Sequence, residues 1–472
     1  MFVTKHPPDR PRGQPLSDRR AQFDSQQHRK SIGRGLRQIE AVDFFNVLTG
    51  PQLLEQTEAH LPEHRERLYP PTVTLAMFMR QALNEDRSCQ KAVNGWAARR
   101  VAEGLSANSV DTGGYCRARQ RLPVGMVMAL TRESGRLLSA RAPKCWGWRG
   151  RAVKLVDGST ISMPDTTANQ ACYPQPCSQA AGVGFPLARI LAVICLSTGA
   201  VTDAGMSACE GAGNSELGLL RSLGAALCAG DVMLADALFC NYFLIATLQA
   251  AGVDVVFEQH GGRITDFRRG QSLGVRDHRV HWHKPPARPQ WMTPEQYHDF
   301  PQTLTVREVK VEGRILVTTM LDQRRVKKCE LAKLYARRWN VELDLRNIKT
   351  TLGVDVLSCR TPHMVVKEMW VHLLAYNLIR LLMAQAACAA QIHPRQLSFK
   401  HTLQLWTQWT SCRLLSTAAR HLANLFRLIA QVKVGERPGR LEPRMRKRRP
   451  KAYPWLQVSR AQARQIAAHA HA

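Results

Sequence analysis

Three acidic residues stand where a folded chain could bring their carboxylates together. Asp157 ends the apolar run 152–156 and Asp236 ends the run 231–235, so each is predicted at or near the carboxyl end of a core strand. Open α/β sheets bind their ligands at that edge. Hard divalent cations need clustered oxygen ligands, and two such ions can activate a water and stabilise the departing oxygen in phosphodiester cleavage. Together with Glu342, these residues predict metal-dependent chemistry on a phosphodiester.

Glu342 lies in the sequence YARRWNVELDLRNIK, which predicts a helix over 335–349 because no proline or glycine interrupts it. At about a hundred degrees per residue, one stripe of this helix carries Tyr335, Arg338, Glu342, Arg346 and Lys349. An apolar stripe adjoins it and is expected to pack on a core. Cations beside the single carboxylate would hold substrate phosphates that carboxylates repel.

Each of these features also has a purely structural interpretation. Arg338, Glu342 and Arg346 are spaced for an i,i+4 salt-bridged face, which contributes a few tenths of a kcal/mol per pair on exposed helices. Taken alone, the stripe favours that interpretation. Asp157 begins the turn sequence DGST, and Asp236 precedes a predicted helix that it could cap. The argument for a metal site therefore depends on all three carboxylates together.

The charge balance of this 472-residue chain indicates a polyanionic partner. Lys plus Arg number 66 and Asp plus Glu 37, a formal charge of +29, while 44% hydrophobic residues allow folded cores. Lysines and arginines that displace counterions from phosphates supply most of the affinity for nucleic acid. Solubility is the alternative explanation for the charge.

Cysteine usage and hydropathy argue against other classes of protein. The 13 cysteines are scattered, and the closest pair, Cys172 and Cys177, has no second pair or histidine cluster nearby. Reduced thiols are the simplest account, with neither a zinc site nor a disulfide framework. The most apolar long segment, 364–387, is interrupted by Lys367, Glu368 and other polar residues. It predicts a buried helix and no membrane partner.

The order of patterns along the chain predicts an α/β core with helical and basic attachments. Short apolar runs rich in β-branched residues predict strands, and helical periods alternate with them after residue 210. The predicted units are a flexible basic arm at 1–35, a helical DNA-binding domain at 36–145, the first part of the catalytic core at 146–257, a β-rich insertion at 258–325, the C-terminal helices of the core at 326–395, and a C-terminal helical region with a basic tail at 396–472.

A short element in the N-terminal helical region carries side chains suited to DNA. The sequence YCRARQRLP predicts a short helix and includes Tyr115, Arg117, Arg119 and Arg121. In outline the region resembles helix-turn-helix readers of DNA. Surface arginines that only aid solubility are the alternative.

The spacing of Tyr335, two residues, Arg338, three residues, Glu342, six residues and Lys349 resembles the signature of the insertion-sequence-four family of bacterial DDE transposases, in its Tyr-Arg-Glu-Lys subgroup. The sequences VDGSTISMPDT and GDVMLADALFCNYF resemble the two aspartate blocks of that family. The resemblance covers residues from about 40 to 455.

This resemblance implies an RNase H-like core of the retroviral integrase type. Asp157, Asp236 and Glu342 would be the catalytic ligands of two Mg²⁺ ions, which Mn²⁺ can replace. Contacts to phosphates at the transposon end would come from Tyr335, Arg338 and Lys349. The helical region, including Tyr115, Arg117, Arg119 and Arg121, would recognise the terminal inverted repeats.

The function implied is cut-and-paste transposition. The partners would be double-stranded DNA at the terminal inverted repeats and the target, with a protein dimer in the synaptic complex and no small-molecule substrate. The expected location is the bacterial cytoplasm, on the nucleoid when bound to DNA. Relatives usually carry an arginine straight after the second aspartate, whereas this chain has Ala237 and Leu238. A catalytically impaired copy that represses transposition, and a stand-alone structure-specific nuclease, are the alternatives.

Overall fold

The structure of the chain is a computed structural model. It describes residues 68–102, 104–106, 108–211, 213–223, 226–412, 419–434 and 456–470. The predicted basic arm at 1–35 and the basic sequence at 435–455 lie outside these residues.

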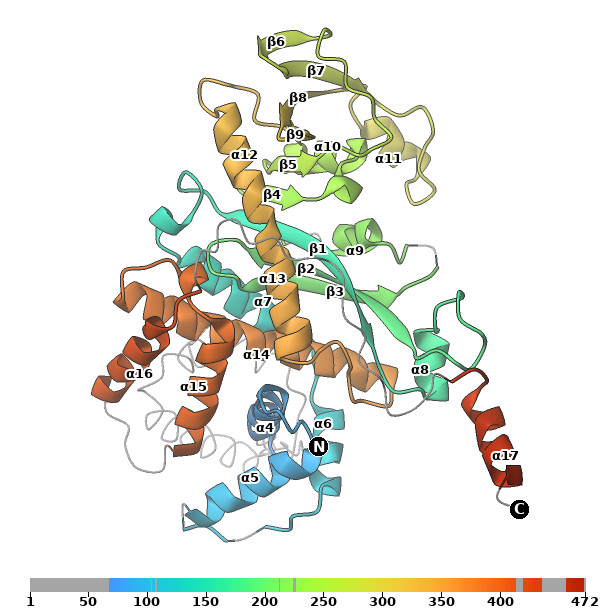
Figure 1. Cartoon of the computed structure of the whole chain (residues 1–472), viewed down its shortest axis with the longest axis vertical. Helices are drawn as coiled ribbons and strands as arrows, with labels where there is room; N and C mark the ends of the chain where they lie inside the picture. The colour runs from blue at the N-terminus through green and yellow to red at the C-terminus, as the bar shows by residue number, and fades with distance from the viewer. Residues whose placement is uncertain are drawn as a thin grey trace, which may run out of the picture.

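A nine-stranded mixed sheet forms the centre of the protein, in the order β3-β2-β1-β4-β5-β9-β8-β7-β6 (Figure 1). The neighbours of β1 are β2, which is antiparallel to it, and β4, which is parallel to it; β4 is in turn parallel to β5. The strands are β1 (Val153–Ser162), β2 (Leu187–Cys195), β3 (Val201–Ala208), β4 (Val232–Ala235), β5 (Asp254–Glu258), β6 (Gln271–Gly274), β7 (Asp277–His283), β8 (Thr303–Val311) and β9 (Arg314–Thr318). The predicted α/β class is confirmed.

The parallel pairing of β1 and β4 determines where two of the predicted site residues lie. Leu155 of β1 is the register partner of Leu234 of β4. Asp157 and Asp236 each follow two residues later, so the two lie side by side on neighbouring strands. Asp236 directly follows the end of β4, as the sequence predicts, whereas β1 continues to Ser162, so Asp157 lies in the middle of its strand and not at its carboxyl end.

Helices cover both faces of the sheet. Leu155 lies in a core cluster with residues of α7 and α14, whereas its neighbour Val156 lies in a second cluster with residues of α9 and α10. Buried strands of this kind present alternate side chains to opposite faces. The helical elements are α4 (Pro71–Leu83), α5 (Cys89–Ala102), α6 (Gly113–Arg121), α7 (Val124–Ala140), η1 (Lys144–Trp146), α8 (Thr167–Cys172), α9 (Glu216–Ser222), η2 (Ala237–Phe239), α10 (Tyr242–Ala250), α11 (Pro294–Asp299), α12 (Lys328–Ala336), η3 (Arg337–Trp339), α13 (Asn340–Arg346), η4 (Asn347–Thr351), α14 (Pro362–Ala389), η5 (Pro394–Gln396), α15 (Phe399–Cys412), α16 (Ala419–Gln431) and α17 (Arg460–Ala470).

The long apolar segment 364–387 lies within α14, which runs through the interior beside α7 (Figure 1). Among the residues described, α14 is the single helix long and apolar enough to cross a membrane, but 89% of its most apolar window is buried in the protein. It is therefore a core helix.

Strands β6 to β9 and helix α11 fall within the stretch predicted as a β-rich insertion, 258–325. These strands continue the central sheet beyond β5, because β9 pairs with β5 in antiparallel fashion. In Figure 1 they lie at one end of the molecule, and α4, α5 and α6 lie at the other. The division of the chain into separate domains stays a prediction.

One glycine provides a test of the packing of α7 on the sheet. A Cβ added to Gly135 would lie 2.0 Å from the carbonyl oxygen of Val201 on β3. We expect Gly135→Ala to push α7 away and to lower the free energy of unfolding by about 1–3 kcal/mol in urea denaturation.

The control is Gly95→Ala in α5, where an added Cβ meets nothing within 4 Å. Alanine is the better helix former, so this variant should be stabilised by about 0.5–1 kcal/mol. Equal effects of the two substitutions would contradict the packing described.

Candidate active site

Asp157 lies on β1 in a partly buried position, opposite Ala192 of β2. Its Oδ1 accepts a hydrogen bond of 2.8 Å from the amide of Gly158. Burial raises the pKa of Asp157 to about 6, and the negative charges of Asp236 and Glu216 add to the rise, against the opposing effects of the Gly158 amide and of Arg338. The carboxyl group therefore stands in a surplus of negative charge.

Asp236 follows β4 directly and caps the short helix η2. Its Oδ1 accepts a hydrogen bond of 2.9 Å from the amide of Leu238. Asp236 thus has a capping role, but on η2, whereas the predicted helix, α10, is capped by Asn241. The cap on η2 does not exclude a second role, because a carboxylate has several lone pairs and this cap occupies one oxygen.

Arg338 is the group that the three carboxylates share. It donates a hydrogen bond of 3.2 Å to Oε1 of Glu342, one turn along the helix. Burial lowers the pKa of Arg338, but the acidic groups of Tyr335, Asp157, Glu342 and Asp236 raise it by more. Arg338 thus contacts Glu342 directly and interacts electrostatically with Asp157 and Asp236. The salt bridge predicted between Arg338 and Glu342 is present, whereas Arg346 is exposed.

The donor set suits a hard divalent cation, because all three candidate ligands are carboxylates. Among the residues that the structure describes, no group of three His, Cys, Asp or Glu side chains is arranged to hold a metal ion. Arg338 supplies the nearby positive charge instead, at 16% exposure of its side chain, and Glu342 remains 36% exposed. Burial is the main cause of the raised pKa of Asp157, and the charges of Asp236 and Glu216 add to it. The oxygen donors of Asp157, Asp236 and Glu342 suit a divalent cation, and their role as its ligands stays a prediction.

The predicted helix over 335–349 is not one continuous α-helix. It consists of the end of α12, the 3₁₀ turn η3, the α-helix α13 and the π-helical turn η4. The prediction assumed one α-helical period throughout. The 3₁₀ and π-helical turns change the angle between successive side chains, so the predicted stripe is not straight.

The three residues predicted with Glu342 as phosphate contacts lie in different environments. Arg338 lies among the carboxylates, and Lys349 donates a hydrogen bond of 2.9 Å to Oγ of Ser159 on β1. Tyr335 is only 7% exposed, and its hydroxyl donates to Oε2 of Glu258 at 3.1 Å. Tyr335 thus has a structural contact in this arrangement, and its predicted contact with phosphate stays a prediction.

Two of the four residues predicted to contact DNA on α6 are buried. The hydroxyl of Tyr115, which is fully buried, donates to Oε1 of Gln81 at 2.9 Å. Arg119 stacks on Phe78 and contacts the thiol sulfur atoms of two cysteines. Their polar groups already bind inside the protein, so this structure gives both a packing role, and their contact with DNA stays a prediction. Arg117 and Arg121 are exposed, and for them the prediction stands.

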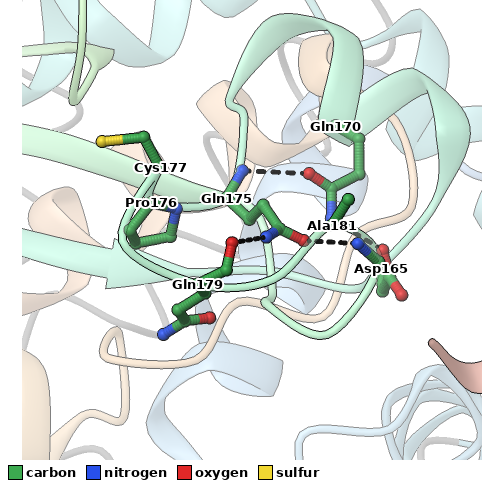
Figure 2. Close-up of a pocket in the computed structure, with 8 residues that line it drawn as sticks. Asp165, Gln170, Gln175, Pro176, Cys177, Gln179 and Ala181 are labelled. Atoms are coloured by element: carbon green, nitrogen blue, oxygen red, sulfur yellow. Dashed lines mark hydrogen bonds between the residues drawn. The ribbon is translucent and has the colours of Figure 1, made fainter. Parts of the chain in front are cut away.

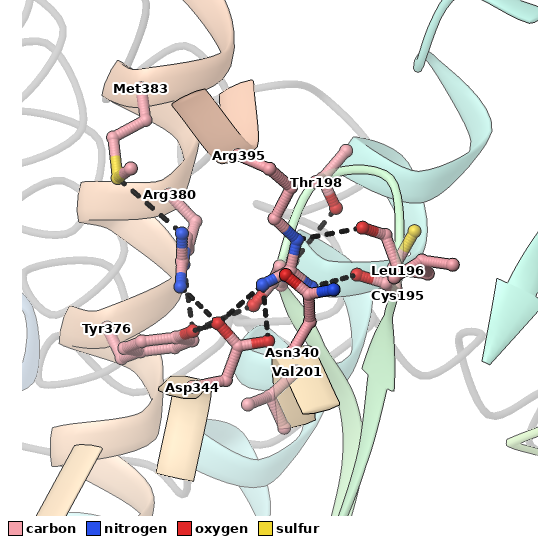
Figure 3. A network of polar contacts seen from close by, with 12 residues as sticks. Cys195, Leu196, Thr198, Val201, Asn340, Asp344, Tyr376, Arg380, Met383 and Arg395 are labelled. Atoms are coloured by element: carbon pink, nitrogen blue, oxygen red, sulfur yellow. Dashed lines mark hydrogen bonds and ion pairs between the residues drawn. The ribbon is translucent and has the colours of Figure 1, made fainter. Parts of the chain in front are cut away.

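Asp344, two residues after Glu342 on α13, is buried. Figure 3 shows its carboxylate between Arg380 of α14 and Arg395. Arg395 donates to both oxygens at 2.7 and 2.6 Å, Arg380 pairs with Oδ1, and the Tyr376 hydroxyl lies 3.1 Å from Oδ1. Asp344 is therefore an anchor for α13, two residues from Glu342.

A hollow in the loop between α8 and β2 is separate from these carboxylates (Figure 2). Glutamine side chains brace it, as when Gln170 donates to Asp165 at 2.8 Å and Gln175 donates to the carbonyl of Gln179 at 3.1 Å. None of Asp157, Asp236 and Glu342 lines it, so it is not part of the candidate site.

The anchor can be tested with Asp344→Asn. The substitution leaves Arg380 and Arg395 without their buried counter-charge, so we expect the free energy of unfolding to fall by about 3–5 kcal/mol in urea denaturation. Asp322→Asn, which breaks an exposed pair with Arg325, is the control and should change stability by less than about 1 kcal/mol. A similar loss in both variants would argue against the anchoring role.

The charge surplus around Asp157 predicts a pH dependence in metal-free protein. A raised pKa means that the folded state binds the proton more tightly than the unfolded chain does, so the ionised carboxylate destabilises the fold above about pH 6. Asp157→Asn keeps an acceptor for Gly158 and should be more stable than the wild type by about 1–3 kcal/mol at pH 8. Near pH 4 the difference should disappear in thermal unfolding with EDTA. A difference that is the same at both pH values would contradict the charge surplus.

Comparison with known proteins places this geometry in a family. The transposase DDE domain family matches residues 148–378, which include Asp157, Asp236 and Glu342. The chain is 28% identical over 452 residues to the transposase InsG for insertion sequence element IS4 of Escherichia coli (strain K12), covering 90% of this chain and 97% of that protein. A solved piggyBac transposase synaptic complex with hairpin DNA is similar over 84% of this chain and 86% of that chain, at 12% identity and a TM-score of 0.43, too distant to support an inference. These matches support an insertion-sequence-four family DDE transposase.

Proposed function

We propose that this transposase binds the terminal inverted repeats of its insertion sequence and catalyses metal-dependent cleavage and strand transfer of DNA. The observation that carries the proposal is the interaction of Arg338 with Asp157, Asp236 and Glu342. The order of β3-β2-β1-β4-β5, with β4 and β5 parallel to β1, supports an RNase H-like core. The spacing of Tyr335, Arg338, Glu342 and Lys349 supports the Tyr-Arg-Glu-Lys subgroup.

Asp157, Asp236 and Glu342 would hold two Mg²⁺ ions, or Mn²⁺ in their place. When bound, such ions activate a water and stabilise the leaving oxygen of a phosphodiester. Arg338 and Lys349 supply positive charge from the protein beside these carboxylates, where substrate phosphates need it. In-line attack at phosphorus depends on positioning and electrostatics, so the proposal includes no covalent nucleophile from the protein.

Double-stranded DNA is the proposed partner, both at the transposon ends and at the target. The formal charge of +29 supports it, and so do the exposed arginines Arg117 and Arg121 on α6. Synapsis of two ends requires at least two protein copies on DNA. The proposed location is the bacterial cytoplasm, on the nucleoid when the protein is bound to DNA.

The alternative of a catalytically impaired repressor came from Ala237 and Leu238, which occupy η2 directly after Asp236. The comparisons do not favour it. It would leave end binding intact and abolish cleavage in the wild-type protein, so the assay below separates the two functions.

The proposal is tested with purified full-length protein, Mg²⁺ and a duplex that carries the element's own end. Glu342→Gln removes one carboxylate charge while preserving the shape of the side chain, and we expect the cleavage rate to fall at least about 100-fold. Binding to the end, measured by gel shift, should persist because the arginines and Lys349 remain.

Glu330→Gln on α12 is the matched control, because Glu330 pairs with Arg149 on the surface, away from the carboxylate group. It should cleave at the wild-type rate. Full cleavage by Glu342→Gln would overturn the assignment of the site.

A further inference from the structure

A fourth carboxylate, Glu216, approaches the strand that carries Asp157. It is the first residue of α9, whose N-terminus is capped by Ser215 through a hydrogen bond of 3.1 Å from the amide of Gly218. Its carboxyl group lies against Gly158: an added Cβ there would be 2.3 Å from Cδ, 2.4 Å from Oε1 and 2.7 Å from Oε2 of Glu216. Only glycine at position 158 leaves this space free. The absence of a side chain there lets the Glu216 carboxyl pack against the backbone of β1, next to Asp157.

Glu216 lies on the other side of β1 from the α13 face. Gly158 follows Asp157, and successive residues of a strand face opposite sides of the sheet. Val156, which faces the same way as Gly158, belongs to the core cluster of α9. The two carboxylates therefore flank β1 near its middle, beside the end of β4 where Asp236 lies.

Electrostatic coupling agrees with this placement. Burial raises the pKa of Glu216, and the charge of Asp236 raises it further, while Arg189 of β2 lowers it. The charge of Glu216 is likewise one of the causes of the raised pKa of Asp157. Glu216 thus interacts with both aspartates.

A simpler role for Glu216 would be a structural ion pair with Arg189. The two residues form no ion pair in the structure as described, and the guanidinium of Arg189 donates to the carbonyl of Cys209 at 3.2 Å. No side-chain hydrogen bond to the Glu216 carboxylate is formed by the described residues either. The Glu216 carboxylate is therefore partly buried and forms no ion pair among the described residues, although the charge of Arg189 still lowers its pKa. Its negative charge lies against the backbone next to Asp157.

Resting on the proposed function, we propose that the charge of Glu216 strengthens divalent-cation binding at Asp157, Asp236 and Glu342. Glu216 acts through the electric field at the site and is a positioning residue, not a direct ligand. At the same distance, a negative charge attracts a divalent cation with twice the Coulomb energy with which it attracts a monovalent cation. Burial of the charge reduces the screening by solvent.

The test is Mn²⁺ binding to the full-length protein, followed by electron paramagnetic resonance of the free ion. We expect Glu216→Gln to weaken Mn²⁺ binding about tenfold. Glu216→Asp keeps the charge and should stay close to the wild type. Glu216→Ala is a second neutral variant that should behave like Glu216→Gln, and thermal melting confirms that each variant is folded.

Glu295→Gln is the matched control, because Glu295 also lies in the first turn of a helix capped by a hydroxyl residue, Thr293, but on the insertion. It should bind Mn²⁺ like the wild type. At low Mg²⁺, end cleavage by Glu216→Gln should be slowed, and higher Mg²⁺ should restore it.

Unchanged Mn²⁺ affinity in folded Glu216→Gln would overturn the inference, and so would equal losses in Glu216→Gln and Glu216→Asp, since shape and not charge would then matter. Asp157→Asn, measured alongside, separates this failure from that of the proposed function. If Asp157→Asn weakens Mn²⁺ binding and Glu216→Gln does not, the inference alone fails. If neither does, the cation site itself is wrong.

Discussion

The parallel register of β1 on β4 is the constraint on which the candidate site depends. Leu155 and Leu234 are register partners, and Asp157 and Asp236 follow each of them by two residues. A slip of one residue would turn every apolar side chain of a strand to the wrong face, so the buried clusters on both faces fix this register. Two residues distant in sequence thereby become neighbours on adjacent strands without any direct bond between them.

The third carboxylate depends on a different interaction, the buried pairing of Asp344 with Arg380 and Arg395. Arg395 also donates to the carbonyl of Leu196 at 2.8 Å, which ties α13 to the turn between β2 and β3. Residues two positions apart on an α-helix lie about 200 degrees apart around its axis. Holding Asp344 in the core therefore turns Glu342 toward the opposite side, where Arg338 and the sheet edge lie. Burying charge is costly unless it is paired, and this pairing makes the helix orientation specific.

At the edge of the sheet, negatively charged groups outnumber positively charged ones. Asp157, Asp236, Glu342 and Glu216 lie near Arg338 and Arg189, and the negative groups predominate. This surplus of negative charge destabilises the protein when no cation is bound. It also favours the binding of a cation at the site. The same protein carries a large positive charge elsewhere, which suits a substrate of phosphates.

The sequence by itself determined the α/β class, the position of Asp236 after a strand and the spacing around Glu342, because these follow from apolar runs and from residues close together in the chain. It did not show that the strand of Asp157 continues to Ser162, because the polar residues after Asp157 are typical of a turn. Only the tertiary structure decided which polar residues are buried. Four polar residues are of types that are usually exposed, yet each binds a partner on another element: Tyr115, Arg119, Tyr335 and Asp344. Glu216 was missed because its approach to the active strand requires the packing of α9 against Gly158. The periodicity of the sequence predicts which residues share one face of a helix or strand. Whether that face is buried depends on which other elements pack against it.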